Sequence, residues 1–391
     1  MDDQAQANPV YIERVGVYAQ ALRERLADPT FDVWRGEEPP TAEERLSHQA
    51  AFIGRLYQEQ WNRYGWPEEV GGLGGSILHR AAMFDEISAA DIALPGQCMV
   101  LETLASPMIQ FAAPLAATML PAALAGEQWW GQGFSEPEAG SDLAALRCRA
   151  RREGDEYVVS GQKLWTSFGS TASHYVCLVR TGTPESRHRG LTMLAIDRGS
   201  PGVTVRPVAI ASGLNELAEV YFEEVRVPAG CLIGGENEGW RVAMYLLQFE
   251  RSMYGWQSAG IALRRYRDLR DQMRSLDRLP DGSRARFGAL FADITTLRAR
   301  NAQTLCHLAA GKAVGPEASV DKILLARVEI ALNDLARDVL GNQFVWGADP
   351  RIRAWHEDWW YSRSATILGG SAEVQRTIIA DHVLGLPKES V

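Results

Sequence analysis

The chain has 391 residues, 46% hydrophobic and 23% charged, so it is long enough for two or three packed domains and too apolar for a disordered protein. Its net charge of −9 at pH 7 argues against a surface that binds nucleic acid. The five cysteines are scattered and lack a C-x-x-C pair, which argues against a disulfide framework or a zinc site and suits reduced thiols in a cytoplasm.

The first 128 residues have a helical period. Segments 11–27 and 43–65 place apolar residues three and four positions apart, and alanine-rich apolar segments follow to about residue 126. The N-terminus, MDDQAQANPV, is acidic and polar, unlike a secretory signal peptide, and no run of 18 apolar residues predicts a membrane span. We therefore expect an N-terminal α-helical domain over 1–128 in a cytoplasmic protein without membrane contact.

Between residues 129 and 238 the apolar period changes to two. Short segments rich in β-branched and aromatic residues are separated by Gly, Pro or Asp. They span 155–161, 174–181, 190–197, 203–210 and 218–228. Because no helical segment lies between them, they predict a middle domain over 129–238 that is an antiparallel β barrel or sandwich.

From Gly239 onward the helical period returns in long segments, at roughly 239–276, 284–312, 316–341 and 371–384. They predict a C-terminal four-helix bundle over 239–391, so the expected fold class is α+β. The stretch SATILGGSAEVQR (364–376) is typical of a loop that runs into the last helix, with Ser371 as its cap.

Two motifs of the middle domain favour a bound planar cofactor. GQGFSEPEAGSD (131–142) is a turn rich in small residues and hydroxyls, whose backbone N–H groups suit an anion or the edge of a heterocycle. SGQKLWTS (160–167) ends a strand with a stacking surface beside hydrogen-bond donors. GGLGGS (71–76) does not match G-x-G-x-x-G, and no H-E-x-x-H motif indicates a metal. On these residues alone, ordinary loop chemistry stays open as the alternative.

Taken in order, the motifs resemble those of the acyl-CoA dehydrogenase family of flavoproteins, over nearly the whole chain. GFSEPEAGSD resembles the family's signature turn, GQKLWTS its flavin-contacting strand, FEEVRVPAGCLIGGENEGW its β-to-helix crossover, and GGSAEVQRTIIADHVLGLP its C-terminal helix. The resemblance implies a helical domain, a β domain and a four-helix bundle, usually assembled as a tetramer, with FAD as cofactor.

The resemblance also implies which residues bind FAD. Trp165 would pack on the isoalloxazine ring and Ser167 would hydrogen-bond N5, while Ser141 would also lie near the substrate's pantetheine. Arg284 matches an arginine that reaches the pyrophosphate across a subunit interface, and the family's glycine pair is reduced to LGNQ, with only Gly341. The implied cofactor-binding set is Gln132, Phe134, Ser135, Gly140, Ser141, Trp165, Thr166, Ser167, Arg284, Gly341, Ser371 and Glu373.

The catalytic base is also implied by the resemblance. In many members the residue at Gly369 is the catalytic glutamate, but in a minority, similar to isovaleryl-CoA and long-chain acyl-CoA dehydrogenases, it is glycine. There the base lies on the first helix of the C-terminal domain, and the matching residue is Glu250. It would take the α-proton of an acyl-CoA while the β-hydrogen leaves as hydride to the flavin. Gly369 would supply a backbone N–H to the enolate oxygen, and Arg251 and Gly370 match positions on the substrate side.

The residues around Glu250 support this role independently. Glu250 lies on an apolar helical stripe with Leu247 and Tyr254, and no basic residue stands three or four positions away. A carboxylate on such a face should have a raised pKa, as a base requires. The alternative is a structural acid paired to a residue of another helix.

The expected activity is FAD-dependent dehydrogenation of an acyl-CoA, as in lipid catabolism and β-oxidation, with an electron-transfer flavoprotein as electron acceptor. Two alternatives remain open. The chain could be the partner subunit of a heteromeric dehydrogenase, which the LGNQ segment favours. The expected assembly is therefore either a homotetramer or a heterotetramer with a paralogue. It could also be an oxygen-using relative, either an acyl-CoA oxidase or a flavin monooxygenase. Glycine at 369, in place of a glutamate over the acyl chain, predicts a preference for branched or bulky acyl groups.

Overall fold

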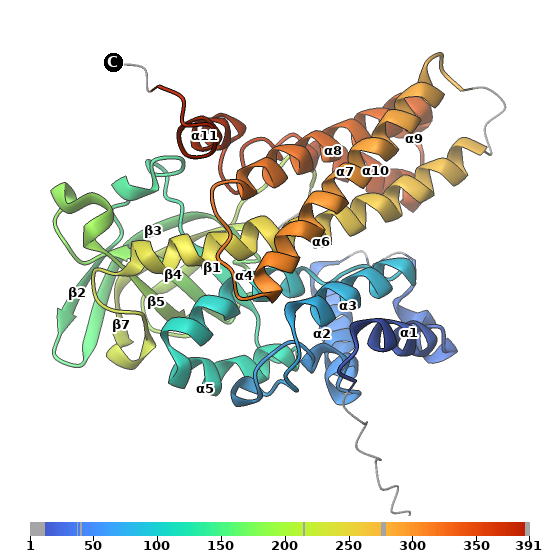
Figure 1. Ribbon diagram of the computed structural model, residues 1–391. Coiled ribbons are helices and arrows are strands. Elements are labelled where there is room, and N and C mark those ends of the chain that lie inside the picture. Colours follow the sequence, from blue (N-terminus) through green and yellow to red (C-terminus); the bar gives the residue numbers. More distant parts are fainter. Residues whose placement is uncertain (1–11, 37, 40, 214–215, 275–278, 388–391) are drawn as a thin grey trace, which may run out of the picture.

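A computed structural model describes residues 12–36, 38–39, 41–213, 216–274 and 279–387 of the chain. Figure 1 shows N-terminal helices below, a β-sheet on the left and a C-terminal group of helices on the upper right. The fold class is α+β, as the sequence predicts. No helix in these ranges is long and apolar enough to cross a membrane.

Among the described residues, the N-terminal part contains five α-helices. The apolar faces of the first three meet in a core that includes Tyr18, Phe52 and Phe84, whereas the last two contribute buried residues such as Leu104 and Leu120 to a second core shared with the sheet. Ser76 caps the third helix by accepting the backbone N–H of Leu78. The helices are α1 (Val15–Leu26), α2 (Ala42–Gln58), α3 (Ile77–Ala89), α4 (Gly96–Phe111) and α5 (Ala113–Leu124).

The middle part is one eight-stranded sheet with the order β6-β7-β3-β2-β4-β5-β8, and β1 pairs with β4. Most neighbours are antiparallel, as predicted, but β1 and β2 both pair with β4 in parallel. These two parallel pairings join strands that are distant in sequence, which an alternating pattern does not reveal. The strands are β1 (Trp130–Gly133), β2 (Arg149–Glu153), β3 (Glu156–Ser167), β4 (His174–Arg180), β5 (Leu191–Asp197), β6 (Val203–Pro207), β7 (Leu217–Pro228) and β8 (Leu232–Ile233).

The C-terminal bundle differs from the sequence expectation in its fourth helix. Its core draws on α6, α7, α8 and α10, whereas α11 contributes no residue to that core among the described residues. The sequence pattern missed α10 because its apolar residues are mostly tryptophans interrupted by charges, and its start depends on an Asp349 cap followed by Pro350. The helices are α6 (Gly239–Arg274), α7 (Ser283–Ala309), α8 (Ala318–Leu340), α9 (Asn342–Trp346), α10 (Pro350–Ser362) and α11 (Ala372–Ile378).

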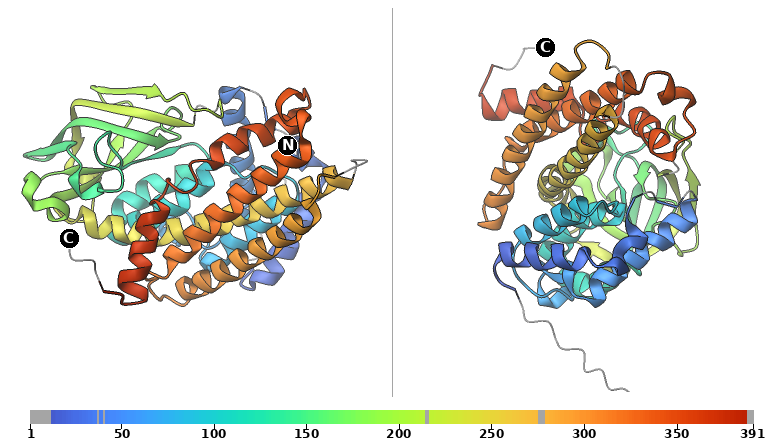
Figure 2. Two further views of the ribbon diagram at one scale, coloured as in Figure 1. Left: turned by 90° about the horizontal axis from the view of Figure 1, so that it is seen from above. Right: turned by 90° about the vertical axis from the view of Figure 1, so that its right-hand side faces the viewer.

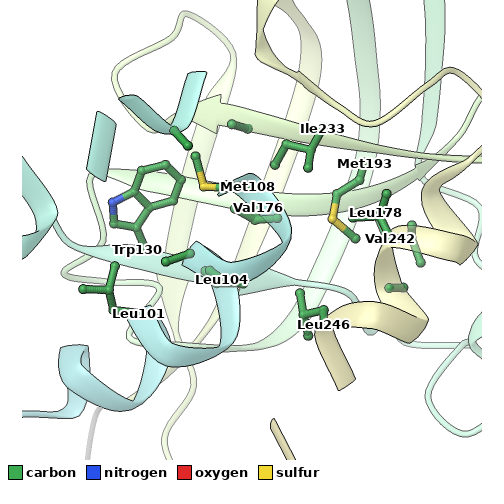
Figure 3. Close-up of a cluster of buried hydrophobic side chains, with 14 of the residues drawn as sticks. Leu101, Leu104, Met108, Trp130, Val176, Leu178, Met193, Ile233, Val242 and Leu246 are labelled. Carbon is green, nitrogen blue, oxygen red and sulfur yellow. The ribbon is translucent and has the colours of Figure 1, made fainter. Parts of the chain in front are cut away.

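A shared core joins all three parts where α6 begins. Viewed from above, α6 starts beside the sheet and runs to the far end of the bundle (Figure 2). Its first turns are buried against α4 and the sheet, and each fully buried aliphatic side chain contributes about 1.5–3 kcal/mol. This packing fixes α6 one turn before Glu250. Figure 3 shows the cluster: Leu101, Leu104, Met108, Trp130, Val176, Leu178, Met193, Ile233, Val242 and Leu246.

Candidate active site

Trp165 is presented by an irregularity in β3. The pairing of β3 with β7 shifts register between Lys163 and Thr166, and Trp165 has φ of +61°. Such left-handed conformations are costly for a bulky residue and cluster at functional sites. Its side chain is 47% exposed, although both Lys163 and Thr166 are fully buried. The bulge therefore directs a flat aromatic ring out of the sheet.

A buried ion pair clamps the 131–142 turn against this bulge. Lys163 Nζ donates to Glu136 Oε1 at 2.7 Å and to the Phe134 carbonyl at 3.1 Å, and the Leu164 N–H donates to the Ser135 carbonyl at 2.9 Å. Glu136 also accepts the backbone N–H groups of Arg147 and Cys148. Because every charge in the clamp has partners, the turn and the bulge form one rigid unit. Sequence reasoning missed this pair, whose members are far apart in the chain.

The predicted flavin-ring residues lie together along this unit. Gln132 is half-buried in β1, and a β-carbon at the neighbouring Gly131 would lie 3.2 Å from Cγ2 of Thr166. Thr166 Oγ1 is buried and has no hydrogen-bond partner in the described part of the chain. Ser167 ends β3 half-buried, and the tip of the turn, with Gly140 and Ser141, is exposed.

Glu250 lies in the interior of α6, just beyond the shared core. The side chain as a whole is partly exposed, but its Oε2 is inaccessible to solvent and has no hydrogen-bond partner among the described residues. Burial raises the pKa of Glu250, and the positive charges of Arg251 and Lys322 and a hydrogen bond from Gln132 oppose that rise. Gln132 of β1 and Glu250 of α6 therefore meet.

The double-glycine turn before α11 faces the same carboxylate. Gly369 has φ of +64°, and a β-carbon there would lie only 2.9 Å from Glu250 Oε1. A side chain at position 369 would thus point at the place that the Glu250 carboxylate occupies. Gly370 has φ of +97°, and a β-carbon there would clash with the Gln375 amide. The backbone N–H groups of Gly369 and Gly370 donate to no acceptor in the described ranges.

Lys322 of α8 is a site residue that the sequence did not reveal. Its Nζ donates to the Ala365 carbonyl at 2.6 Å, and its Cε lies 3.3 Å from a β-carbon built on Gly369. Burial lowers the pKa of Lys322, while Glu329 and Glu250 oppose that fall. The only sequence signal was a lysine inside an apolar helical run. Within α6, Glu250 indeed has no basic neighbour three or four positions away, but α8 places Lys322 close to Glu250.

Replacing Lys322 by methionine is expected to raise the pKa of Glu250 further, because a stabilising positive charge is lost. The acid limb of the pH profile of kcat should then move to higher pH. The unpaired Ala365 carbonyl should also lower stability by about 1.5–3 kcal/mol. Lys322→Arg keeps the charge and is the control: its acid limb should stay near that of the wild type. An unmoved acid limb in Lys322→Met would contradict the electrostatic role.

The remaining predicted residues divide between the two ends of the bundle. Ser371 caps α11 by accepting the Val374 N–H, as predicted, while Glu373 is exposed beside Arg376. Arg251 is half-buried next to Glu250, and burial lowers its pKa.

Arg284 and Gly341 do not join this site within one chain. Arg284 starts α7 and Gly341 ends α8, and the Arg286–Asp338 ion pair of 2.7 Å links these two helix ends. Along α8 this end lies about 27 Å from Lys322 at 1.5 Å per residue. Both residues are exposed. They therefore stay predictions for a contact with another subunit.

Trp165→Ala is expected to weaken FAD binding about tenfold, because it removes the exposed ring available for stacking. The visible spectrum of the flavin should shift as well. Trp360, another partly exposed tryptophan at 40%, lies on α10 and is the matched control. If Trp165→Ala retained FAD as firmly as Trp360→Ala, with an unchanged spectrum, Trp165 would have no part in cofactor binding.

The site combines an exposed tryptophan with a clamped, hydroxyl-rich turn, and the fold places two helical parts around a sheet. This combination fits a flavin-dependent oxidoreductase. Comparison with protein families agrees. The chain matches the acyl-CoA dehydrogenase N-terminal domain over residues 21–127, the middle domain over 131–225 and the C-terminal domain over 237–384. It therefore belongs to the acyl-CoA dehydrogenase family of FAD-dependent oxidoreductases, as the motifs predict.

Individual relatives cover most of the chain. The acyl-CoA dehydrogenase IpdE1 of Mycobacterium tuberculosis is 34% identical over 90% of this chain and 91% of its own. A cyclohexane-1-carbonyl-CoA dehydrogenase of Geobacter metallireducens is 32% identical over 64% of this chain and 66% of its own. Among solved structures, the ChsE4–ChsE5 complex from M. tuberculosis gives a TM-score of 0.78 at 27% identity, covering 98% of this chain and 100% of that one.

Proposed function

We propose that this protein oxidises the Cα–Cβ bond of an acyl-CoA thioester to a trans-2-enoyl-CoA, with Glu250 as the base. The observation that carries the proposal is the Glu250 carboxylate, which has a buried, unpartnered oxygen and lies opposite the Gly369 turn. Groups of this kind, with a raised pKa and a free acceptor, suit proton abstraction from carbon.

The residues of the middle part fit FAD. Trp165 offers an exposed ring for the isoalloxazine, and the unpartnered Thr166 hydroxyl and the half-buried Ser167 lie beside it in the chain. When bound, FAD would accept the hydride equivalent from the β-carbon. The chain supplies the rigid seat, because the Lys163–Glu136 pair holds the turn and the bulge together.

Glu250 would take the α-proton on its carboxylate and become neutral, which its buried surroundings favour. The free N–H of Gly369 would donate to the thioester oxygen as charge develops there. Lys322 would keep the turn in place through the Ala365 carbonyl. The expected electron acceptor of the protein is an electron-transfer flavoprotein.

We expect a bulky or branched acyl group to be preferred over butyryl, because position 369 carries no side chain and Leu368 is modest in size. The cyclohexane-1-carbonyl-CoA dehydrogenase among the relatives supports this expectation. The test is kcat/KM for matched straight, branched and alicyclic thioesters, since this ratio compares transition states. A clear preference for butyryl-CoA would contradict the expectation.

A heteromeric assembly is the second candidate, favoured by the LGNQ segment and by the exposed Val345 and Trp346 that follow Gly341. The ChsE4–ChsE5 complex is a related pair of subunits. Purification of this chain alone distinguishes the candidates: a yellow, active protein supports a self-sufficient enzyme, and a colourless one a partner subunit. Peroxide formed in air without another acceptor would instead support the oxygen-using alternative.

A further inference from the structure

Gln257 of α6 is a buried polar side chain without a partner. It is 1% exposed, and neither its Oε1 nor its Nε2 has a hydrogen-bond partner among the described residues. An amide buried in this way is costly, because it loses water without replacing those hydrogen bonds. The helix itself does not need glutamine here, since leucine has a similar helix propensity.

Gln257 lies on the same face of α6 as Glu250. Seven residues make almost two turns, so the two side chains point the same way and start about 10.5 Å apart along the helix. Both side chains also reach equally far, since glutamate and glutamine have the same length. The Gln257 amide therefore lies beside the Glu250 carboxylate on this face, displaced from it along the helix axis.

The α6 residues on either side of this face pack against different parts of the molecule. Met253, on one side, packs into the N-terminal core. Tyr254, on the other side, packs against the bundle core, and its hydroxyl hydrogen-bonds Ser258. Gln257 thus lies where the N-terminal helices meet the bundle, on the helix face that also carries Glu250.

The facing helix carries a similar group. α4 packs along α6, with Phe111 and Tyr245 rings 5.2 Å apart at one end. Near the opposite end of α4, Gln97 is 1% exposed; its Oε1 accepts the Trp130 N–H, but its Nε2 has no partner in the described part of the chain. α4 and α6 therefore each carry a buried amide with unused hydrogen-bonding capacity.

We propose that Gln257 recognises a polar substituent, a hydroxyl or a carbonyl, on the acyl group of the substrate. The substituent would lie about 10 Å from the Glu250 carboxylate, so the acyl group must extend well beyond a butyryl chain. An amide can donate to a carbonyl and either donate to or accept from a hydroxyl, so both substituents suit it. This inference rests on the proposed function, because it requires the α-carbon to lie at Glu250.

The experiment compares three thioesters of equal shape: 3-cyclohexylpropanoyl-CoA and its 4-hydroxy and 4-oxo derivatives on the ring. Anaerobic flavin reduction gives kcat/KM for each with the wild type and with Gln257→Leu. The wild type should prefer at least one polar derivative, and Gln257→Leu should reduce that preference by about 10- to 100-fold. Gln303→Leu, on the exposed face of α7, is the matched control and should leave the ratio unchanged.

The outcomes separate this inference from the proposed function. If the unsubstituted thioester bleaches the flavin but Gln257→Leu leaves the polar-to-apolar ratio unchanged, Gln257 does not recognise the substrate and the dehydrogenase proposal stands. If no thioester bleaches the flavin of the FAD-loaded wild type, the proposed function itself fails. Gln257→Leu should also keep its thermal midpoint, because a structural role for the amide predicts a loss of stability instead.

Discussion

Glu250→Gln is expected to slow anaerobic flavin reduction by about a hundredfold or more, while FAD remains bound. Glutamine keeps the size of the side chain and can still meet Gln132, but its amide cannot take a proton. The raised pKa of Glu250 comes mainly from burial, so the loss of charge should not destabilise the fold. The measurement is the rate of flavin bleaching by a saturating acyl-CoA in the absence of oxygen.

A matched control is available in the same bundle. Burial raises the pKa of Glu329 on α8 to about 7, yet Glu329 does not approach Gly369 as Glu250 does. Glu329→Gln removes a buried carboxyl group with the same chemistry and should change flavin reduction much less. If both variants reduced flavin at the wild-type rate, the base would have to be a different residue.

The same pKa shift sets the direction of the pH dependence. The proposed base would act only when deprotonated, so activity should fall as pH drops through the pKa of Glu250. Because burial raises that pKa, the fall should begin above the range of an ordinary glutamate.

Much of this architecture follows from local sequence patterns. The five predicted strand segments all contain strands, and the apolar period locates α6, α7 and α8 to within a few residues. Ser371 was recognisable as a cap because capping depends on one side chain and its own helix. These features need only near neighbours in the chain.

The features that local patterns did not reveal depend on contacts between distant segments. The left-handed backbone of Trp165 arises where β3 and β7 lose register, which involves two strands. The Lys163–Glu136 clamp and the approach of Lys322 to the glycine turn join residues from separate elements. An isolated lysine in an apolar segment is consistent with many structures, so only the folded chain identifies its partner.

The glycine at 369 gives the second large expected effect: Gly369→Ala should lower kcat by about a hundredfold, because a displacement of about 1 Å in a catalytic group has this cost. The new methyl group would lie 2.9 Å from Glu250 Oε1 and 3.3 Å from Lys322 Cε, so the carboxylate or the turn must move. The variant should also lose about 1–2 kcal/mol of folding stability, because alanine is strained in the left-handed backbone conformation. Single-turnover flavin reduction and thermal unfolding measure the two effects separately.

Gly311→Ala is the control that distinguishes the effect of crowding at position 369 from the effect of backbone strain. Gly311 has φ of +68°, close to that of Gly369, but a β-carbon there would meet no atom within 4 Å. Gly311→Ala should therefore lose stability to a similar extent and keep its rate of flavin reduction. If Gly369→Ala lost stability alone, with flavin reduction as fast as in Gly311→Ala, the space between Gly369 and Glu250 would have no role in catalysis. A selective loss of kcat would instead mean that position 369 must lack a side chain because Glu250 occupies the place where one would stand.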